Sequence, residues 1–397
     1  MTQTKKNRRL TPPRRSARLT PEPLTGYPYF PRGLALFIKP IIVTACIMFD
    51  NRGKTGRYLM KPQIDWNTLG FSYFQTDSHI RYAWRDGAWD TGTLVTEPTI
   101  NLHIAATSLH YGQAAFEGMK AFTCKDGAVR LFRPQMNARR MNESARRLCM
   151  AEVPEEMFLD ACRRVISANS HFVPPYGSGG SLYVRPLLFG GGAQIGVSPS
   201  DEYYFLVMVM PVGAYYKGGF KPVRAIVLDD YDRAAPMGTG HVKAGGNYGA
   251  SLEPHMVAHR RGFPVELYLD AREHKYIEEF GTSNFVGITH DGHYVTPMSP
   301  SILPSVTNDS LQQIAQDLGI PVEVRPVLFE EIEQMVEVAA CGTAVVITPV
   351  NEIVRGDRSY KTGPAAGCGP TLERLYKHII GIQYGDLPDT HAWCWKI

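Results

Sequence analysis

The strongest constraint on the fold is an unbroken apolar run at residues 203–210, rich in aromatic and β-branched side chains. Such a run is typical of a strand that is buried on both faces. Shorter apolar patterns on either side alternate between the two-residue period of strands and the 3.6-residue period of helices. Strands are predicted at 103–109, 129–132, 223–228, 265–269, 284–289, 322–325 and 344–348, and helices at 134–150, 155–172, 307–318, 328–336 and 370–381. Mixed elements in this order predict an α/β (α+β mixed) fold with two domains.

Two stretches rich in glycine and proline interrupt these elements. Residues 174–181 precede a strand, and residues 190–199 follow it and suit a connection between domains. We expect a small α/β domain at 61–195 and a large α/β domain at 196–397. Residues 1–60 form a basic arm that is predicted to be disordered, because its start is rich in Arg, Pro and Thr and lacks apolar periodicity.

The net charge of +4 comes from the arm. Residues 1–40 carry nine Lys and Arg and one acid, Glu22, whereas the other 357 residues carry 33 bases and 37 acids. The body is therefore mildly acidic, which argues against a nucleic-acid-binding surface over the fold. The apolar stretch at 34–49 contains Lys39 and Pro40 and is shorter than the ~20 residues of a membrane span. Neither nucleic acid nor a membrane is expected as a partner.

The sequence leaves two compartments as alternatives for the protein, the cytoplasm and the mitochondrial matrix. Six prolines between residues 12 and 31 would interrupt the amphipathic helix of a transit peptide. A transit peptide, a basic tail and a misassigned start site remain equal alternatives. The seven cysteines are an odd number without a C-x-x-C pair, which argues against a disulfide framework and a zinc ribbon and favours a reducing compartment.

The most unusual segment is 238–251, in which five glycines surround Lys243. Glycine permits a positive φ and a close approach of the backbone to a ligand. A lysine in that setting suits either a phosphate or a Schiff base. Ala244 follows the lysine, so the segment is no P-loop. Taken alone, Lys243 is better interpreted as a surface lysine on a solvated turn.

Three further segments have both an ordinary and a chemical interpretation. Residues 278–288 place a carboxylate before a Gly-Thr turn, which suits exposed acids or a carboxylate at a cofactor nitrogen. Residues 302–311 lead into a helix that Ser305 or Thr307 would cap, and free N–H groups there form an anion site. Residues 341–349 are a Gly-Thr turn that enters a buried strand.

Together these segments give the chain a resemblance to a known family. From about residue 65 to 385 it resembles the branched-chain amino-acid aminotransferases, which are pyridoxal-phosphate enzymes of fold type IV. The matching motifs stand in the family's order: HYGQAAFEGMKAF (110–122), RLFRPQMNARRM (130–141), SLYVRPLLFG (181–190), PVGAYY (211–216), VKAGGNYG (242–249), EEFGTSNF (278–285) and ACGTAVVITPV (340–350). The first and fifth motifs are the most specific to the family, whereas E-x-G-T-x-N marks only the fold type.

The resemblance implies roles for individual residues. Lys243 would be the catalytic lysine that forms the Schiff base with pyridoxal 5′-phosphate and moves a proton. Glu279 would lie at the pyridine nitrogen, Tyr248 near the ring oxygen, and Arg140 at the phosphate. Without the motif, Arg140 reads as an exposed helix charge paired with Glu143 or Ser144. The other implied cofactor-binding residues are Thr282, Asn284, Val306, Thr307 and Thr343.

The resemblance also implies a substrate pocket. Aromatic walls would accept Leu, Ile or Val through apolar burial. Arg185 would bind the second carboxylate of glutamate, and the N–H groups of the 342–344 turn would face the α-carboxylate. The implied substrate residues are Tyr111, Phe116, Tyr183, Arg185, Tyr215, Thr343 and Ala344. For any single aromatic, ordinary core packing is the better interpretation.

The reaction implied is transfer of the amino group of a branched-chain L-amino acid to 2-oxoglutarate by a homodimer, in primary or specialised metabolism. The alternatives are a D-amino-acid aminotransferase or an aminodeoxychorismate lyase on the same fold, and a binding protein without activity. Asn308 departs from the family's basic residue, and Val345 and Thr348 replace a redox C-x-x-C. His255 and His259 have a zinc-like spacing but are interpreted as structural, so no metal is expected.

Overall fold

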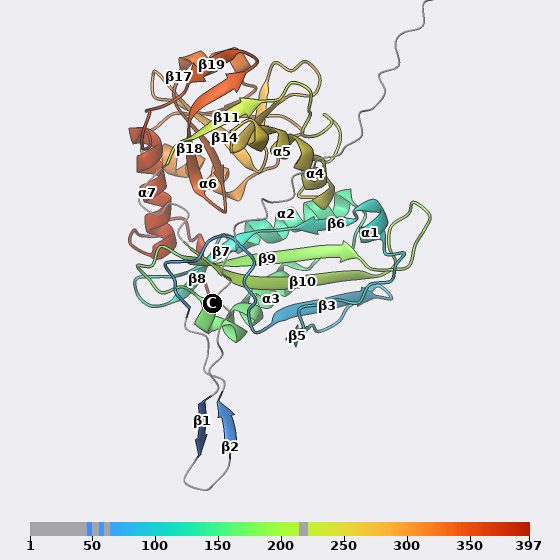
Figure 1. The fold of residues 1–397 in the computed structure, drawn as a ribbon. Coiled ribbons are helices and arrows are strands. Elements are labelled where there is room, and N and C mark those ends of the chain that lie inside the picture. Colours follow the sequence, from blue (N-terminus) through green and yellow to red (C-terminus); the bar gives the residue numbers. More distant parts are fainter. Residues whose placement is uncertain (1–45, 50–54, 59–63, 214–220) are drawn as a thin grey trace, which may run out of the picture. The chain divides into compact units, whose positions relative to one another are not determined.

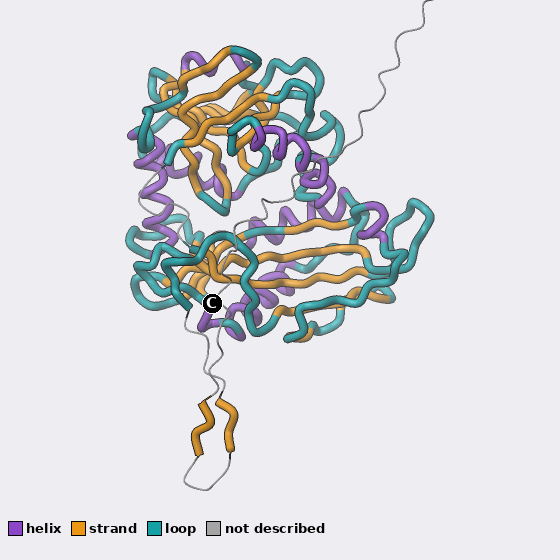
Figure 2. The backbone as a smooth tube through the Cα atoms, viewed as in Figure 1, coloured by secondary structure: helices purple, strands orange, loops and turns teal. Residues whose placement is uncertain are grey.

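The computed structural model describes residues 46–49, 55–58, 64–213 and 221–397 (Figures 1 and 2). Within the N-terminal arm, β1 (Cys46–Phe49) and β2 (Thr55–Tyr58) pair antiparallel. The rest of the 1–60 arm lies outside the described residues. Residues Asp65–Ile397 form a separate compact unit.

The first large sheet of this unit has nine strands. They are β3 (His79–Arg85), β4 (Ala88–Trp89), β5 (Thr93–Val95), β6 (Ala114–Phe116), β7 (Met119–Thr123), β8 (Val129–Phe132), β9 (Ser181–Gly190), β10 (Tyr203–Val212) and β20 (Cys394–Lys396). The order β20-β8-β7-β9-β10-β3-β4 is antiparallel, with β5 beside β3 and β6 beside β9. The apolar run at 203–210 is β10, a central strand, as predicted.

Four short or amphipathic helices belong to this part of the chain: α1 (Thr107–Tyr111), α2 (Pro134–Arg147), α3 (Glu155–Ala168) and the 3₁₀ turn η1 (Ser170–Phe172). Proline at its first position starts α2, since a proline there loses no helical hydrogen bond. Phe158, Ala161, Cys162 and Val165 are buried at the i, i+3, i+4, i+7 spacing of α3, which packs on β10 and β3.

The second large sheet also has nine strands. They are β11 (Val223–Val227), β12 (Val265–Leu269), β13 (Ile277–Phe280), β14 (Ser283–Thr289), β15 (Tyr294–Pro297), β16 (Val322–Arg325), β17 (Met335–Gly342), β18 (Val346–Arg355) and β19 (Arg358–Lys361). The path β13-β12-β11-β18-β17-β14 closes on itself, because β13 also pairs with β14. Such closure removes the exposed edges of a sheet. β15 and β16 continue from β14.

The remaining helices are α4 (Gly245–Ala250), α5 (Leu252–Arg260), α6 (Val306–Asp317), α7 (Pro370–Tyr384) and the 3₁₀ helix η2 (Phe329–Gln334). One core cluster joins both large sheets: Phe122 and Phe132 of the first sheet pack with Ile347 of the second and with Leu375 of α7. No helix in the described parts of the chain is long and apolar enough to cross a membrane.

The change from one sheet to the other lies later than the predicted boundary between residues 195 and 196. β10 pairs with β9 along its whole length, so the first sheet reaches Val212, and the C-terminal strand β20 returns to it. The Gly-rich stretch at 190–199 is a connection within one sheet. Its composition marks a loop but cannot say which sheet the next strand joins. The assignment of separate small and large domains stays a prediction.

Most predicted elements match within a few residues, and three differ. The strand expected at 103–109 is a turn followed by the one-turn helix α1, which ends at Gly112 in the left-handed conformation. The helix expected at 328–336 is 3₁₀ and yields to β17 at Met335. The strand expected at 344–348 begins only at Val346, after a turn. The segments at 103–109 and 328–336 are too short for their apolar spacing to distinguish one type of element from another.

Candidate active site

Lys243 lies between β11 and α4, and its backbone is tied to the first sheet and its helix. Its N–H donates to Ser144 Oγ of α2 at 3.0 Å, and its carbonyl accepts from the N–H of Phe116 at 3.2 Å. The next residue, Ala244, forms an isolated β-bridge with Ala115. The segment is therefore packed against neighbouring elements, and the solvated turn considered from Lys243 alone is wrong.

The Lys243 amine faces two aromatic rings. Its Nζ donates to Tyr248 Oη at 2.7 Å and lies 4.8 Å from the centroid of Phe116. Burial, followed by the nearby Arg140 guanidinium, lowers the pKa of Lys243 to about 8. Burial also raises the pKa of Tyr248 to about 12, so the phenol keeps its proton. At neutral pH, the uncharged and nucleophilic fraction of the Lys243 amine is therefore larger than that of an exposed lysine.

Of the five glycines around Lys243, Gly240 lies closest to neighbouring elements. None of the five in 238–251 has a positive φ. Gly240 is the crowded position: a Cβ there would collide with the carbonyl oxygen of Ser301 and with the guanidinium of Arg233. A side chain at residue 240 would push apart the loop that carries Lys243 and the loop before α6.

Glu279 is a buried carboxylate in β13, with three donors around it. Its Oε1 accepts from the N–H of Leu303 at 3.0 Å and pairs with Arg233 Nη2 at 2.9 Å, while its Oε2 accepts from Asn284 Nδ2 at 3.0 Å. Burial raises the pKa of Glu279, and the Arg233 cation opposes that rise. Asn284 also donates to the carbonyl of Leu303, so the predicted E-x-G-T-x-N turn holds its own carboxylate in place. Thr282 lies exposed on that turn.

Arg140 is buried, and its partner is Glu117. Nε and Nη2 of the guanidinium donate to the two carboxylate oxygens of Glu117, each at 2.7 Å, and Nη1 donates to the carbonyl of Pro304 at 2.6 Å. Asn137 donates to Glu117 at 2.8 Å. The exposed pairing with Glu143 or Ser144 is wrong. Glu117 lies within the first matching motif, but no role was predicted for it, because a single acid after an apolar residue does not indicate an ion pair.

Helix α6 begins beside Arg140. Ser305 is its N-cap, and its side chain accepts a hydrogen bond from the N–H of Asn308 at 3.1 Å. Of the two predicted caps, Ser305 and Thr307, the first is confirmed. The first N–H groups of a helix, here those of Val306 and Thr307, have no intrahelical acceptor and attract anions. Thr343 borders the same small cavity as Val306 and Thr307. The structure therefore brings together the predicted phosphate-binding groups of three elements.

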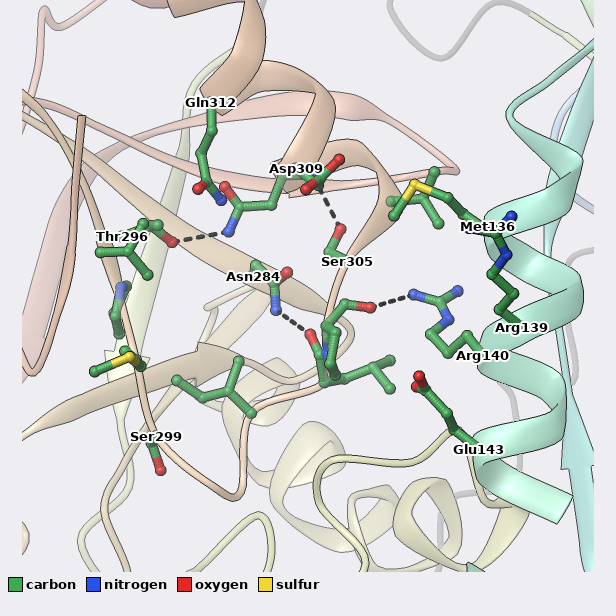
Figure 3. Close-up of a pocket in the computed structure, with 18 residues that line it drawn as sticks. Met136, Arg139, Arg140, Glu143, Asn284, Thr296, Ser299, Ser305, Asp309 and Gln312 are labelled. Atoms are coloured by element: carbon green, nitrogen blue, oxygen red, sulfur yellow. Dashed lines mark hydrogen bonds between the residues drawn. The ribbon is translucent and has the colours of Figure 1, made fainter. Parts of the chain in front are cut away.

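A larger cavity, of about 410 Å³, lies between α2 and the segment that leads into α6 (Figure 3). In Figure 3, Arg140 reaches from α2 to the Pro304 carbonyl, and Asn284 donates to the carbonyl of Leu303. Arg140, Asn284 and Val306 line this cavity, whereas Lys243 does not. The cavity thus borders three of the predicted cofactor-binding residues but not the predicted Schiff-base lysine.

Three predicted substrate residues, Phe116, Tyr183 and Arg185, are linked to Lys243 through successive contacts. The Arg185 guanidinium lies 4.7 Å from the centroid of Phe116 and 5.2 Å from that of Tyr183, and its Nη2 donates to Tyr183 Oη at 2.9 Å. The Nε of Arg185 is buried without a hydrogen-bond partner among the described residues. Phe71, which sequence reasoning missed, packs edge-on against Tyr183 at 4.9 Å. Phe116 therefore connects the lysine to an arginine with donor capacity to spare.

The other predicted substrate residues lie differently. Tyr111 is exposed at the end of α1, where its hydroxyl donates to the carbonyl of Ile195. Tyr215 lies outside the described residues. Thr343 and Ala344 form the turn before β18, and the Ala344 carbonyl accepts from Lys120 Nζ at 2.7 Å. Lys120 was not predicted, since a lysine within a strand pattern usually points to solvent.

The departures from the family pattern have local structural roles. Asn308 is buried, accepts from Tyr294 Oη at 2.7 Å and donates to Thr296 Oγ1 at 2.8 Å. His255 contacts the His259 ring edge-on and pairs with Glu266 at 3.2 Å. Within the described residues, no three His, Cys, Asp or Glu side chains are grouped to hold a metal ion.

Comparisons with known proteins agree with this geometry. Residues 114–353 match the family model of the class IV amino-transferases. The chain is 49% identical over 340 residues to a branched-chain-amino-acid aminotransferase of Haemophilus influenzae, covering 84% of this chain and 99% of that protein. The crystal structure of the Escherichia coli branched-chain amino acid aminotransferase has a TM-score of 0.66 at 29% identity and covers 79% of this chain and 98% of that one.

A T.th. branched-chain amino acid aminotransferase, complexed with N-(5'-phosphopyridoxyl)-L-glutamate, also has a TM-score of 0.66, at 26% identity, and covers 79% of this chain and 97% of that one. The family match at residues 114–353 includes the Lys243 segment and the Glu279 turn. The chain therefore belongs to the branched-chain amino-acid aminotransferases, within the class IV aminotransferase family of fold type IV.

Proposed function

We propose that this chain transfers the amino group of branched-chain L-amino acids to 2-oxoglutarate, with pyridoxal 5′-phosphate as its cofactor. The observation that carries the proposal is the Lys243 amine, half-buried, 2.7 Å from the Tyr248 phenol and with its pKa lowered to about 8. A partly buried amine with a depressed pKa and a hydroxyl partner is the usual form of a lysine that binds a carbonyl compound.

The residues around Lys243 fit the cofactor at both of its ends. Arg140, the first N–H groups of α6 and the Thr343 hydroxyl would hold the phosphate. Glu279 would bind the protonated pyridine nitrogen, and its three donors fix the carboxylate for that task. Thr282 and Asn284 would support the Glu279 turn. When bound, pyridoxal 5′-phosphate supplies an electron sink that stabilises negative charge at the substrate Cα.

The chain's own residues would then move the proton. Lys243 Nζ takes it from the substrate Cα, since an amine with a pKa near 8 both accepts and returns a proton close to neutral pH. Tyr248 Oη orients that amine through the 2.7 Å hydrogen bond. The rings of Phe116 and Tyr248, 4.8 Å apart, exclude water on one side of it.

The substrate pocket would extend from Phe116 to Arg185. Phe116 and Tyr183 offer apolar surface to a branched side chain, and we propose Tyr215 as a further wall. The free donor of Arg185 would bind the distal carboxylate of glutamate. The N–H groups of the turn at Thr343 and Ala344 would bind the α-carboxylate shared by both substrates.

A substrate panel tests this function. The purified chain, loaded with pyridoxal 5′-phosphate, is given glutamate and a series of 2-oxo acids, and in parallel D-alanine and 4-amino-4-deoxychorismate. We expect transfer to the branched 2-oxo acids and none from the other two compounds. Preferred turnover of D-alanine or of 4-amino-4-deoxychorismate would support the alternative reactions of the fold. A chain that neither binds the cofactor nor turns over any substrate would support a binding protein.

We further propose a homodimer, because the segment around α1 and the loop after β9 expose large apolar side chains. Ile104, Leu109, Ile195 and Val197 are each more than 60% exposed. A hydrogen bond from the Tyr111 hydroxyl to the Ile195 carbonyl joins the end of α1 to the loop that carries Ile195 and Val197. Exposed patches of this kind mark interfaces between proteins. A monomer in light scattering, or a dimer unchanged by Val197→Asp, would contradict this assignment.

Of the two compartments left open, we propose the cytoplasm. The relative at 49% identity is bacterial, and the comparisons give no support to the mitochondrial matrix. Imaging of the tagged full chain in its own cells tests this assignment.

A further inference from the structure

Arg233, which sequence reasoning passed over, lies directly behind Glu279. It stands in the loop between β11 and α4, and its side chain is 7% exposed. Its Nη2 pairs with Glu279 Oε1 at 2.9 Å and donates to the carbonyl of Gly240 at 3.1 Å and to that of Ser301. One guanidinium therefore joins the loop of Lys243, the loop before α6 and the carboxylate of β13.

Arg233 offsets the negative charge of two neighbouring buried carboxylates. Glu278 and Glu279 are neighbours in β13 and both are buried. Ser299 and Ser301 donate hydroxyl hydrogen bonds to Glu278, but these donors carry no charge. Burial raises the pKa of both carboxyls, and the Arg233 cation opposes the rise in each. A buried carboxylate without a cation takes up a proton.

The other titratable groups that act on Glu279 come from three elements. Lys243 lies before α4 and favours the carboxylate form of Glu279, whereas Glu278 on the same strand disfavours it. Tyr248 of α4 and Cys341 of β17 also face Glu279, and their raised pKa values leave both uncharged at neutral pH. Among the described residues that act on Glu279, Arg233 still carries a positive charge once Lys243 is engaged with a ligand or loses its proton.

We propose that Arg233 is a positioning residue that compensates the buried charge of Glu279 and holds its carboxylate for the cofactor's pyridine nitrogen. This rests on the proposed function, since it assigns Glu279 to that nitrogen. A neutral, protonated carboxyl would have no charge with which to attract a protonated pyridine. Arginine suits the task because it does not lose its proton in proteins and its planar fork reaches several acceptors.

The alternative is that Arg233 only fastens two loops through the carbonyls of Gly240 and Ser301. A double-mutant cycle on the full chain separates the two roles. The dissociation constant of pyridoxal 5′-phosphate is measured at one pH for the wild type, Arg233→Met, Glu279→Gln and the double variant. Arg224→Met is the matched control, because Arg224 pairs with Glu352 at the surface of β11.

If Arg233 acts through Glu279, each single variant should weaken cofactor binding by about tenfold or more. The double variant should then bind about as well as Glu279→Gln alone, because the neutral amide of that variant leaves no charge to compensate. Arg233→Lys should recover part of the loss, and Arg224→Met should bind like the wild type. Losses that multiply in the double variant would overturn the proposal in favour of loop fastening.

The pH dependence gives a second test. In Arg233→Met the pKa of Glu279 should lie further above its unfolded value. The variant's extra stability from a protonated Glu279 is then complete below the unfolded pKa of about 4.5 and is lost as pH rises through the folded pKa. Urea unfolding should show this loss in Arg233→Met and not in the double variant. Parallel pH profiles would overturn the proposal. A wild type that fails to bind pyridoxal 5′-phosphate would instead contradict the proposed function.

Discussion

Replacing Arg185 by methionine tests how one pocket accepts both glutamate and leucine. Methionine keeps much of the apolar contact over Phe116 but removes the cation and its donors, among them the buried Nε, which has no partner among the described residues. A hydrogen bond to a charged group contributes about 1.5–3 kcal/mol. At about 1.4 kcal/mol for each factor of ten, kcat/KM for glutamate should fall roughly tenfold to a hundredfold. Leucine has no second carboxylate and should lose little.

The assay follows each half-reaction separately through the absorbance of the bound cofactor. Tyr183→Phe is the matched control, because it removes the hydroxyl that accepts from Arg185 Nη2 at 2.9 Å and leaves the cation in place. This variant should keep the preference for glutamate. Equal losses for both substrates in Arg185→Met would show that the arginine only supports Tyr183. A loss confined to leucine would refute the pocket assignment.

Three further predictions concern other parts of the molecule. Burial lowers the pKa of Lys243 to about 8, so the cofactor-free chain should take up pyridoxal 5′-phosphate faster as pH rises towards 8 and at a constant rate above it. Stopped-flow absorbance measures this rate, and a midpoint near pH 10.5 would refute the prediction. Lys120→Met should raise KM for leucine and glutamate together by about tenfold, because it frees the Ala344 carbonyl, and a fall in kcat alone would argue against that role. Deleting residues 1–60 should leave turnover unchanged, and a folded but inactive truncation would show that the arm completes the site.

Sequence reasoning predicted the elements with a strong period and misplaced those without one. The buried strand β10, helix α2 and helix α6 were predicted to within a few residues, because their apolar spacing is long and regular. The 103–109 segment was too short to distinguish a strand from a turn and one helical turn. Pairing between distant strands also decided the sheet boundary, and a Gly-rich loop carries no information about such pairing.

For the site, the motifs identified the residues that we propose to face the cofactor, but not the charged residues that pair with them. Lys243, Tyr248 and Glu279 stand in segments of unusual composition. Glu117 and Arg233 are single charged residues among ordinary neighbours, and their importance appears only when the fold buries them beside Arg140 and Glu279. Because a buried charge needs a partner, each predicted ionic residue implied an unnamed counter-charge that sequence spacing could not locate.

The most direct test of the account is turnover by Lys243→Ala. The variant and the wild type are loaded with pyridoxal 5′-phosphate and given leucine and 2-oxoglutarate, with circular dichroism as the check on folding. Lys275→Ala is the control, because Lys275 is an exposed lysine whose ion pair is with its neighbour Glu273. The account predicts a folded Lys243→Ala chain without turnover and an unchanged control. A folded Lys243→Ala chain with turnover near that of the wild type would contradict it.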